Sequence, residues 1–222
     1  MKRPRSRSAL ALLVIALLVL PTVGVFWLDQ QVRAARPPSP VAETSKLVVD
    51  RHDQLLRAFT VADGRWRLPV RVDDVDPLFI ELLLAYEDRR FFDHGGVDAR
   101  AMLRAAGQAL RHGRIVSGGS TLTMQVVRLT TGASTRDLAG KWRQVVDALA
   151  LERAADKQAI LTAYLHLAPY GGNLEGIRAA SLAWLGKEPT RLTPAQAALL
   201  VALPQSPAAR RPDRFPEAAR QA

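Results

Sequence analysis

Two adjacent carboxylates, Glu87 and Asp88, follow a run of almost wholly apolar residues. A carboxylate that emerges from an apolar helix is partly desolvated, and this suits it to proton transfer. Phe91 and His94 complete the segment, which reads EDRRFFDHGG. The segment therefore predicts an acid–base site centred on Glu87. The plainer alternative is a solvated helix end with acid–arginine pairing, in which His94 is a structural hydrogen-bonding group.

A second segment of chemical interest is SGGSTLTMQ at residues 117–125. Glycines before the first turn of a helix expose backbone N–H groups, and the hydroxyls of Ser120 and Thr121 add donors. That combination suits a phosphate or a sugar. The segment is not a P-loop, because the Lys–Ser/Thr pair is missing at the required spacing. Plain capping of a helix by Ser120 is the simpler alternative.

The chain has 222 residues and a formal net charge of +10, carried mostly by arginine. Such a charge suits an anionic partner, whether nucleic acid, bilayer headgroups or a phosphorylated substrate. Codon usage in a GC-rich genome is an alternative cause of the arginine excess. The chain has no cysteine, which excludes a disulfide framework and a thiolate metal site. No metal-ligand cluster stands out, so the sequence requires no cofactor.

The N-terminus is almost unbroken apolar sequence from residue 9 to residue 28. As a helix, about 20 residues span a hydrocarbon core of about 30 Å, and this run is longer than the apolar region of a signal peptide. We therefore expect a basic cytoplasmic tail at 1–8, a transmembrane anchor at 9–28 and a linker at 29–45. The positive-inside rule then places the rest of the chain on the outer side of the cytoplasmic membrane.

The body of the chain, 46–222, is predicted to be mainly α-helical with a small β element at its start. Two apolar runs within 46–61 flank a polar turn and predict a β-hairpin. Asp98 and Asp156 are suited to cap helices, and Thr193 opens a capping box with proline at the first helical position. The expected helices span 77–86, 99–111, 120–128, 135–153, 157–167, 173–185 and 194–203.

Four segments stand in the chain in a fixed order: EDRRFFDHGGVD (87–98), GGSTLTMQ (118–125), a helix around Lys141, and KQAILTAYLHLAPYGG (157–172). With this order and spacing, the chain resembles the family 51 glycosyltransferases over roughly residues 45–220. These are the transglycosylase domains of bifunctional penicillin-binding proteins and of monofunctional peptidoglycan transglycosylases. Details resemble the N-terminal part of the penicillin-binding protein 1C branch. The resemblance implies a lysozyme-like helical domain that lies against the membrane.

The resemblance also implies an activity, the polymerisation of lipid II into β-1,4-linked glycan strands. Lipid II is a disaccharide-pentapeptide on undecaprenyl pyrophosphate. Glu87 would be the general base that takes the proton from the 4-hydroxyl of the acceptor GlcNAc as that oxygen attacks C1 of the donor MurNAc. Undecaprenyl pyrophosphate leaves, and the anomeric centre inverts. Arg128 and Lys141 fall at the family positions associated with this leaving group, although for Arg128 a solvated helix face is the plainer alternative.

One departure from the family concerns the donor side, where many members carry a glutamate three residues after the motif lysine. Gln144 stands there, and an amide cannot carry charge or shuttle a proton. Asp147, one helical turn further on, is the candidate substitute. The family positions that contact the sugar or phosphate, or that surround the base, are Asp88, Phe91, His94, Ser120, Thr121 and Gln125.

The expected partners are lipid II, the growing glycan strand, the cytoplasmic membrane and other cell-wall synthesis proteins. Nucleic acid is not expected, since the anchor places the basic domain outside the cytoplasm. We expect the basic surface and the apolar segments at 76–86 and 115–129 to hold the domain on anionic lipid. Because the substrate carries a diphosphate, a divalent cation, Mg²⁺ or Mn²⁺, is compatible with the reaction.

Two other functions compete with this one. A lysozyme-like lytic glycosidase would use Glu87 as a general acid, often with a second carboxylate. A non-catalytic scaffold that binds lipid II is suggested by Gln144 and by the absence of an S-x-x-K transpeptidase nucleophile after the glycosyltransferase region. That absence predicts a fragment of a bifunctional protein, with a monofunctional relative as the alternative.

Overall fold

The computed structural model describes residues 5–113, 119–134 and 137–221, and in the first helix it describes side chains from residue 19 onward. The chain divides into two compact units, Met1–Arg36 and Pro37–Ala222. The candidate chemistry predicted from the sequence falls in the second unit.

Helix α1, Arg5–Ala34, makes up most of the first unit. Within the part of the chain that the structure describes, no helix has both the length and the apolarity needed to cross a membrane. The predicted tail at 1–8 and anchor at 9–28 lie largely outside the described side chains, so the anchor stays a prediction. The helix continues to Ala34, and the extended segment therefore begins at residue 35, later than the predicted linker at 29–45.

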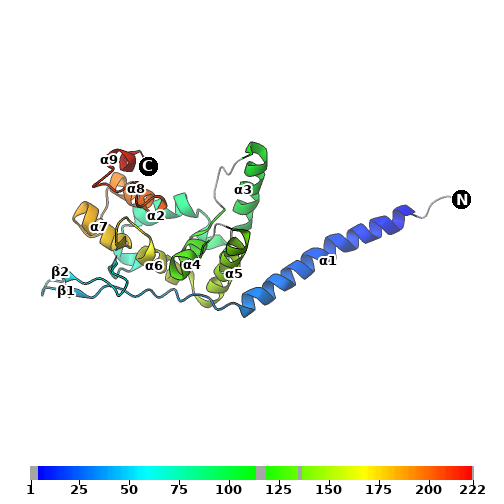
Figure 1. The fold of residues 1–222 in the computed structure, drawn as a ribbon, viewed down its shortest axis with the longest axis horizontal. Coiled ribbons are helices and arrows are strands. Elements are labelled where there is room, and N and C mark those ends of the chain that lie inside the picture. The colour runs from blue at the N-terminus through cyan, green and yellow to red at the C-terminus, as the bar shows by residue number, and fades with distance from the viewer. Residues whose placement is uncertain (1–4, 114–118, 135–136, 222) are drawn as a thin grey trace. The chain divides into compact units, whose positions relative to one another are not determined.

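The second unit is mainly helical with a small β element at its start, as predicted (Figure 1). Strand β1 (Leu47–Val49) pairs antiparallel with β2 (Leu55–Ala58), which confirms the predicted hairpin. The α-helices are α2 (Pro77–Glu87), α3 (Ala99–His112), α4 (Leu122–Thr131), α5 (Leu138–Ala154), α6 (Lys157–Leu167), α7 (Ile177–Leu185), α8 (Pro194–Ala202) and α9 (Pro216–Arg220). The 3-10 helices are η1 (Val72–Asp74), η2 (Phe91–Asp93) and η3 (Leu203–Gln205).

Side-chain caps account for several helix starts. The carboxylates of Asp98 and Asp156 each accept a hydrogen bond from a backbone N–H in the first turn, as predicted. Thr193 forms the predicted capping box of α8. Helix α4 differs from the prediction, because its cap is Thr121 and not Ser120. The hydroxyl of Ser120 is therefore not used by the helix start and is available to another partner.

A second pair of strands was not expected from the sequence. Strand β3 (Trp66–Arg67) pairs in parallel with β4 (Leu174–Glu175), and a buried ion pair joins Arg67 to Glu175. The sequence at 65–70 suggests another extended piece, which contains β3, but the pairing was not predictable, because each strand has two residues and the two lie far apart in the chain. The helix predicted at 173–185 is consequently wrong in its first turn, since α7 begins at Ile177.

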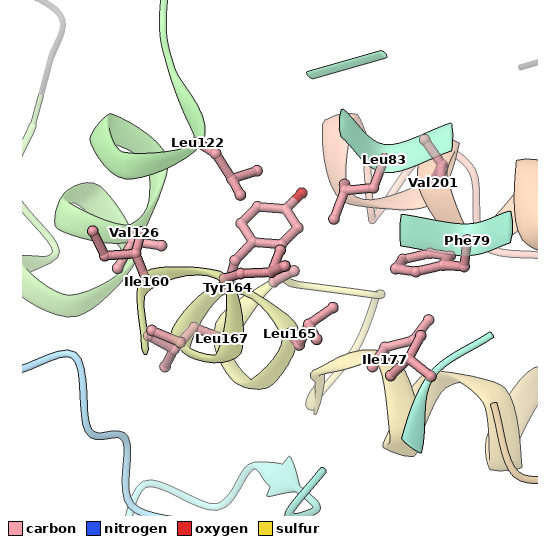
Figure 2. Packing of buried hydrophobic residues seen from close by; sticks show 14 of the residues in the cluster. Phe79, Leu83, Leu122, Val126, Ile160, Tyr164, Leu165, Leu167, Ile177 and Val201 are labelled. Atoms are coloured by element: carbon pink, nitrogen blue, oxygen red, sulfur yellow. The ribbon is translucent and has the colours of Figure 1, made fainter. Parts of the chain in front are cut away.

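Tyr164 of α6 lies at the centre of the core (Figure 2). Leu122 of α4 lies on one side of its ring, and Phe79 and Leu83 of α2 lie toward the other side. Burial raises the pKa of the Tyr164 hydroxyl well above its ordinary value, and the negative charge of Glu87 adds to this shift. The core therefore packs α2 and α4 around α6 and brings Glu87 close to the buried phenol.

The apolar residues of α4 face this core. Leu122 and Met124 are fully buried, as are Phe79 and Leu83 of α2. The expectation that the segment at 115–129 contacts lipid is therefore wrong for its apolar residues from 122 onward, and its first four residues lie outside the described residues. The apolar pattern of α4 reflects its burial among other helices rather than contact with a bilayer.

The loop after α2 approaches two helices closely at Gly96. Its φ of +94° is a conformation that other residues rarely adopt, and a Cβ at this position would lie 2.6 Å from the carbonyl oxygen of Ala148. The carbonyl oxygen of Gly96 also accepts a hydrogen bond of 2.6 Å from Oγ1 of Thr121. The absence of a side chain at residue 96 therefore permits the contact with α5 and the link to the start of α4.

We expect Gly96→Ala to lower the free energy of unfolding. Backbone strain at a positive φ costs about 1–3 kcal/mol, and the collision of the added Cβ with the carbonyl oxygen of Ala148 adds to this cost. Chemical denaturation followed by circular dichroism measures the effect. Gly95→Ala is the matched control, since a Cβ at Gly95 would meet nothing within 4 Å. Equal stability of the two variants would show that the loop does not depend on this close approach.

Candidate active site

Two amide side chains hold the carboxylate of Glu87 at the C-terminal end of α2. Its Oε2 accepts a hydrogen bond of 2.8 Å from Nε2 of Gln125 in α4, and its Oε1 accepts one of 3.2 Å from Nε2 of Gln205 in η3. Gln205 is itself oriented, since its Oε1 accepts a hydrogen bond of 3.1 Å from the hydroxyl of Tyr86. Glu87 is half-buried. Within the described residues Glu87 forms no acid–arginine pair, since amides bind its carboxylate, whereas Arg90 and Asp98 of the same segment do form such a pair.

Sequence reasoning missed Gln205. This residue lies 118 positions after Glu87 in the chain and outside the four segments that carry the family resemblance. The packing of α8 beside α2, visible in Figure 1, brings η3 to the end of α2. The sequence around it, LPQSP, has the character of a turn and contains no chemical pattern, so no local signal identifies its role.

Asp88 connects the loop after α2 to the start of α4. Its carboxylate is buried, lies 3.0 Å from Nε2 of His94 and accepts a hydrogen bond of 2.9 Å from the backbone N–H of Leu122. A carboxylate at this place also favours the partial positive charge of a helix N-terminus. His94 is thus the structural hydrogen-bonding group that the plainer reading of the segment predicts. Asp88 fixes Glu87 relative to α4, the helix that carries Gln125.

Lys157 supports the same loop from α6. Its ammonium lies 4.4 Å from the ring centroid of Phe91 and donates hydrogen bonds of 2.6 Å to the carbonyl oxygen of His94 and to Oε1 of Glu152. Phe91 is fully buried. Phe91 and His94 therefore shape the loop that follows Glu87.

Lys141 of α5 lies beside the N-terminus of α4. Its ammonium donates hydrogen bonds to Oγ of Ser120 (2.7 Å) and to Oε1 of Gln144 (3.0 Å). Burial lowers the pKa of Lys141, and the positive charge of Arg128 lowers it further. Arg128 is exposed on α4. Two cations close enough for the charge of Arg128 to act on Lys141 are suited to bind one anion.

Gln144 is buried and joins α5 to α4. Its Nε2 donates a hydrogen bond of 2.6 Å to the carbonyl oxygen of Met124, while its Oε1 accepts from Lys141. An ionised glutamate here would place a carboxylate against that carbonyl oxygen with no hydrogen to donate. Asp147 lies further along α5, half-buried, and burial raises its pKa while the charge of Arg143 opposes the rise. Gln144 thus has a structural role that a glutamate would not reproduce.

A polar cavity of about 540 Å³ opens beside Glu87. Ser120 and Thr121 form part of its wall, and the hydroxyl of Thr121 points away to Gly96. A second cavity, of about 580 Å³ and largely apolar, lies between α2, α8 and α9 and shares Tyr86 with the first. The polar cavity holds the carboxylate and the hydroxyls, so the chemistry belongs there.

The predicted residues therefore form two connected groups. Glu87 and Gln125 lie in direct contact in the first, backed by the buried side chains of Asp88, Phe91 and His94. The second group contains Lys141, Ser120, Gln144 and Arg128. The N-terminal half of α4 links the two groups, and Ser117 and Gly118 of the predicted glycine turn lie outside the described residues.

Comparison with known proteins places this chain in a family. The transglycosylase family model matches residues 52–222, which is more than half of the chain. The chain is a transglycosylase-family member. The chain is 49% identical over 187 residues to penicillin-binding protein 1C of Escherichia coli (strain K12), an alignment that covers 83% of this chain and 24% of that protein.

Other relatives agree with this assignment. The chain is 38% identical over 155 residues to penicillin-binding protein 1A of Aquifex aeolicus, with 70% of this chain and 21% of that protein covered. It spans no more than about a quarter of the length of these relatives. A crystal structure of penicillin-binding protein 1A from Haemophilus influenzae matches with a TM-score of 0.41 and 18% identity over 80% of this chain and 17% of that one.

The lowered pKa of Lys141 gives a direct test of the cation pair. Lysine is charged below its pKa, so Lys141 loses its charge at a lower pH than a solvated lysine does. We expect Arg128→Gln to raise the pKa of Lys141 part of the way toward the ordinary lysine value, since burial, the larger cause, is unchanged. Titration of the lysine side chain by NMR measures the shift.

The control for this titration is Arg143→Gln on the exposed face of α5, where the arginine charge acts on Asp147 instead. This variant should leave the pKa of Lys141 where it is in the unchanged chain. An unaltered Lys141 titration in Arg128→Gln would mean that the two cations do not share one site.

Proposed function

We propose that this chain is a peptidoglycan glycosyltransferase that polymerises lipid II into glycan strands and releases undecaprenyl pyrophosphate. The observation that carries the proposal is the arrangement along α4, from its start to Arg128 in its last turn. There an oriented carboxylate, Glu87, lies on one side, and the cations Lys141 and Arg128 lie on the other. The reaction needs a base for the acceptor and fixed positive charge for the leaving group.

In the proposed reaction Glu87 accepts the proton of the acceptor 4-hydroxyl as its oxygen forms a bond to C1 of the donor MurNAc. The bond from C1 to the diphosphate oxygen breaks, and its electron pair departs with the diphosphate. Hydrogen bonds from Gln125 and Gln205 hold the carboxylate in one orientation. That positioning lowers the entropic part of the barrier, because the base need not be ordered during the reaction.

The departing diphosphate is proposed to bind at Lys141 and Arg128. The planar guanidinium can contact two oxygens together, and the ammonium acts as a compact charge. Gln144 is proposed to position Lys141 rather than to transfer a proton, since its amide binds that ammonium. The half-buried Asp147 is the candidate for any further proton transfer on this side.

A divalent cation, Mg²⁺ or Mn²⁺, is proposed to accompany the substrate diphosphate. The described residues contain no group of three or more His, Asp or Glu side chains that could hold a metal ion. The cation would therefore be held by diphosphate oxygens and water, and the steps proposed for Glu87 and Lys141 do not pass through it.

The carboxylates near Glu87 favour the transferase over a lytic glycosidase. A glycosidase of the lysozyme type pairs its general acid with a second carboxylate facing the sugar. The other two carboxylates that line the polar cavity are Asp88 and Asp98. Asp88 is committed to His94 and α4, and Asp98 to Arg90 and its own helix cap. Neither faces the cavity with a free oxygen pair, which leaves Glu87 without the required partner.

We expect Glu87→Gln to lower the rate of lipid II polymerisation by about 10²–10⁴-fold, because an amide of the same shape cannot accept the proton. Gel separation of labelled glycan strands measures the rate, and lipid II binding should persist. Glu81→Gln, on an exposed position of α2, is the control. Polymerisation that survives in Glu87→Gln would remove the proposed base. Degradation of preformed glycan by the unchanged chain would instead support the glycosidase.

The second unit is also proposed to contact the outer face of the cytoplasmic membrane through α3. Leu103 and Leu110 lie seven positions apart on this helix, with side chains 74% and 88% exposed, and Arg100 and Arg111 flank them. Residues seven apart share one face of a helix. Exposed leucines with flanking cations are suited to the headgroup region of anionic lipid.

Vesicle flotation of the unit 37–222 tests this contact. We expect Leu103→Gln with Leu110→Gln to weaken binding to phosphatidylglycerol vesicles by roughly tenfold or more, because two leucines no longer bury apolar surface. Leu56→Gln, which changes an exposed leucine of β2, is the control. Equal flotation of both variants would place the membrane contact elsewhere.

A further inference from the structure

The polar cavity beside Glu87 contains positive charge that no predicted role uses. Arg89, Arg90 and Arg104 all line it together with Glu87. Arg90 is neutralised, since its guanidinium binds the carboxylate of Asp98 through two nitrogens. That interaction also lowers the pKa of Asp98 and so keeps the pair ionised.

Arg89 and Arg104, unlike Arg90, have no carboxylate partner in the part of the chain that the structure describes. Across residues 5–113, 119–134 and 137–221, neither forms an ion pair or a side-chain hydrogen bond. The two come from separate elements, because Arg89 follows α2 directly and Arg104 lies in the second turn of α3. The fold therefore brings two guanidinium groups that have no partner among the described residues to the same cavity as the carboxylate of Glu87.

The described carboxylates of that cavity form no ion pair with Arg89 or Arg104. Asp88 and Asp98 are occupied by other partners, as described above, and amide donors hold both oxygens of Glu87. The guanidinium groups of Arg89 and Arg104 are exposed and have hydrogen-bond donors free for an anion that enters the cavity. These free donors point to an anionic group that lies in the cavity together with the acceptor hydroxyl.

If the proposed function is correct, on which this inference rests, the reaction brings two diphosphates to the protein. The donor diphosphate leaves, and the cations Lys141 and Arg128 are assigned to it. The acceptor is also a lipid-linked saccharide, and its diphosphate stays attached throughout the reaction. We propose that Arg89 and Arg104 bind the retained diphosphate of the acceptor. The two arginines then orient the acceptor so that its 4-hydroxyl reaches Glu87.

Arginine suits this task because a planar guanidinium forms two parallel hydrogen bonds to diphosphate oxygens. Such binding is required equally before and during bond formation, since the acceptor diphosphate does not react. Loss of the arginines should therefore weaken acceptor binding and leave the chemical step nearly unchanged.

The test uses the full chain and a donor lipid II whose own 4-hydroxyl is blocked. Three acceptors are compared: one with diphosphate and pentapeptide, one that lacks only the diphosphate, and one that lacks only the pentapeptide. We expect Arg89→Gln and Arg104→Gln each to raise KM for the two diphosphate acceptors by roughly 10- to 100-fold. The kcat should change by less than about twofold, and the acceptor without diphosphate should show no change in KM.

Arg191→Gln, which changes an exposed arginine outside the cavity, is the matched control and should behave as the unchanged chain does. Arg104→Lys should restore part of the loss, because it keeps the charge without the planar geometry. A KM change that is equal for all three acceptors would overturn the proposal in favour of a structural role. A change that disappears only when the pentapeptide is removed would assign the arginines to peptide carboxylates and also overturn it.

Equilibrium binding of the diphosphate acceptor to the unchanged chain and to the arginine variants separates this inference from the proposed function. Weaker binding in Arg89→Gln and Arg104→Gln, together with no glycan synthesis by the unchanged chain, would support the anion site and reject the glycosyltransferase. Normal glycan synthesis with unaltered acceptor binding in both variants would reject only the assignment of Arg89 and Arg104.

Discussion

The buried carboxylate of Asp88 is the contact on which the candidate site depends. It holds the loop after α2 through His94 and the start of α4 through the backbone N–H of Leu122. Glu87 precedes it in the chain, and Gln125 lies one turn into α4. The buried carboxylate of Asp88 binds both the loop after α2 and the start of α4. It therefore sets the position of Glu87 relative to Gln125. A buried carboxylate is tolerable only with such partners, so the geometry and the stability of this region have the same origin.

The sequence predicted the parts of this fold that depend on neighbours in the chain. Caps at Asp98 and Asp156, the hairpin and most helices follow from residue order within a turn or two. Contacts that join distant segments were not predictable in this way. Gln205 reaches Glu87 across 118 positions, and the apolar residues of α4 are equally consistent with lipid or core until the packing of α6 is known. Resemblance identified Glu87 and Lys141, but it could not indicate which side chains hold them.

Gln144 shows how a departure from a family pattern acquires a physical meaning in three dimensions. In the sequence, the amide appears as a missing acid. In the structure, its nitrogen binds the carbonyl oxygen of Met124 and its oxygen binds Lys141, so both ends of the amide are used. A carboxylate could satisfy only one of these partners. The positive charge of Lys141 is consequently oriented by a neutral group, which leaves more of that charge for an incoming anion.

The hold of Gln205 on Glu87 affects how the protein responds to heat. Gln205 lies in a three-residue 3-10 turn, and short elements with few internal hydrogen bonds open locally at a lower free energy than a buried core does. Each such opening removes one of the two donors from the base while the helices around Tyr164 stay packed. Glu87, the proposed base, thus has both amide donors only in molecules whose turn is closed. Thermal inactivation should therefore begin below the temperature of global unfolding, and hydrogen exchange at residues 203–206 would report the same opening.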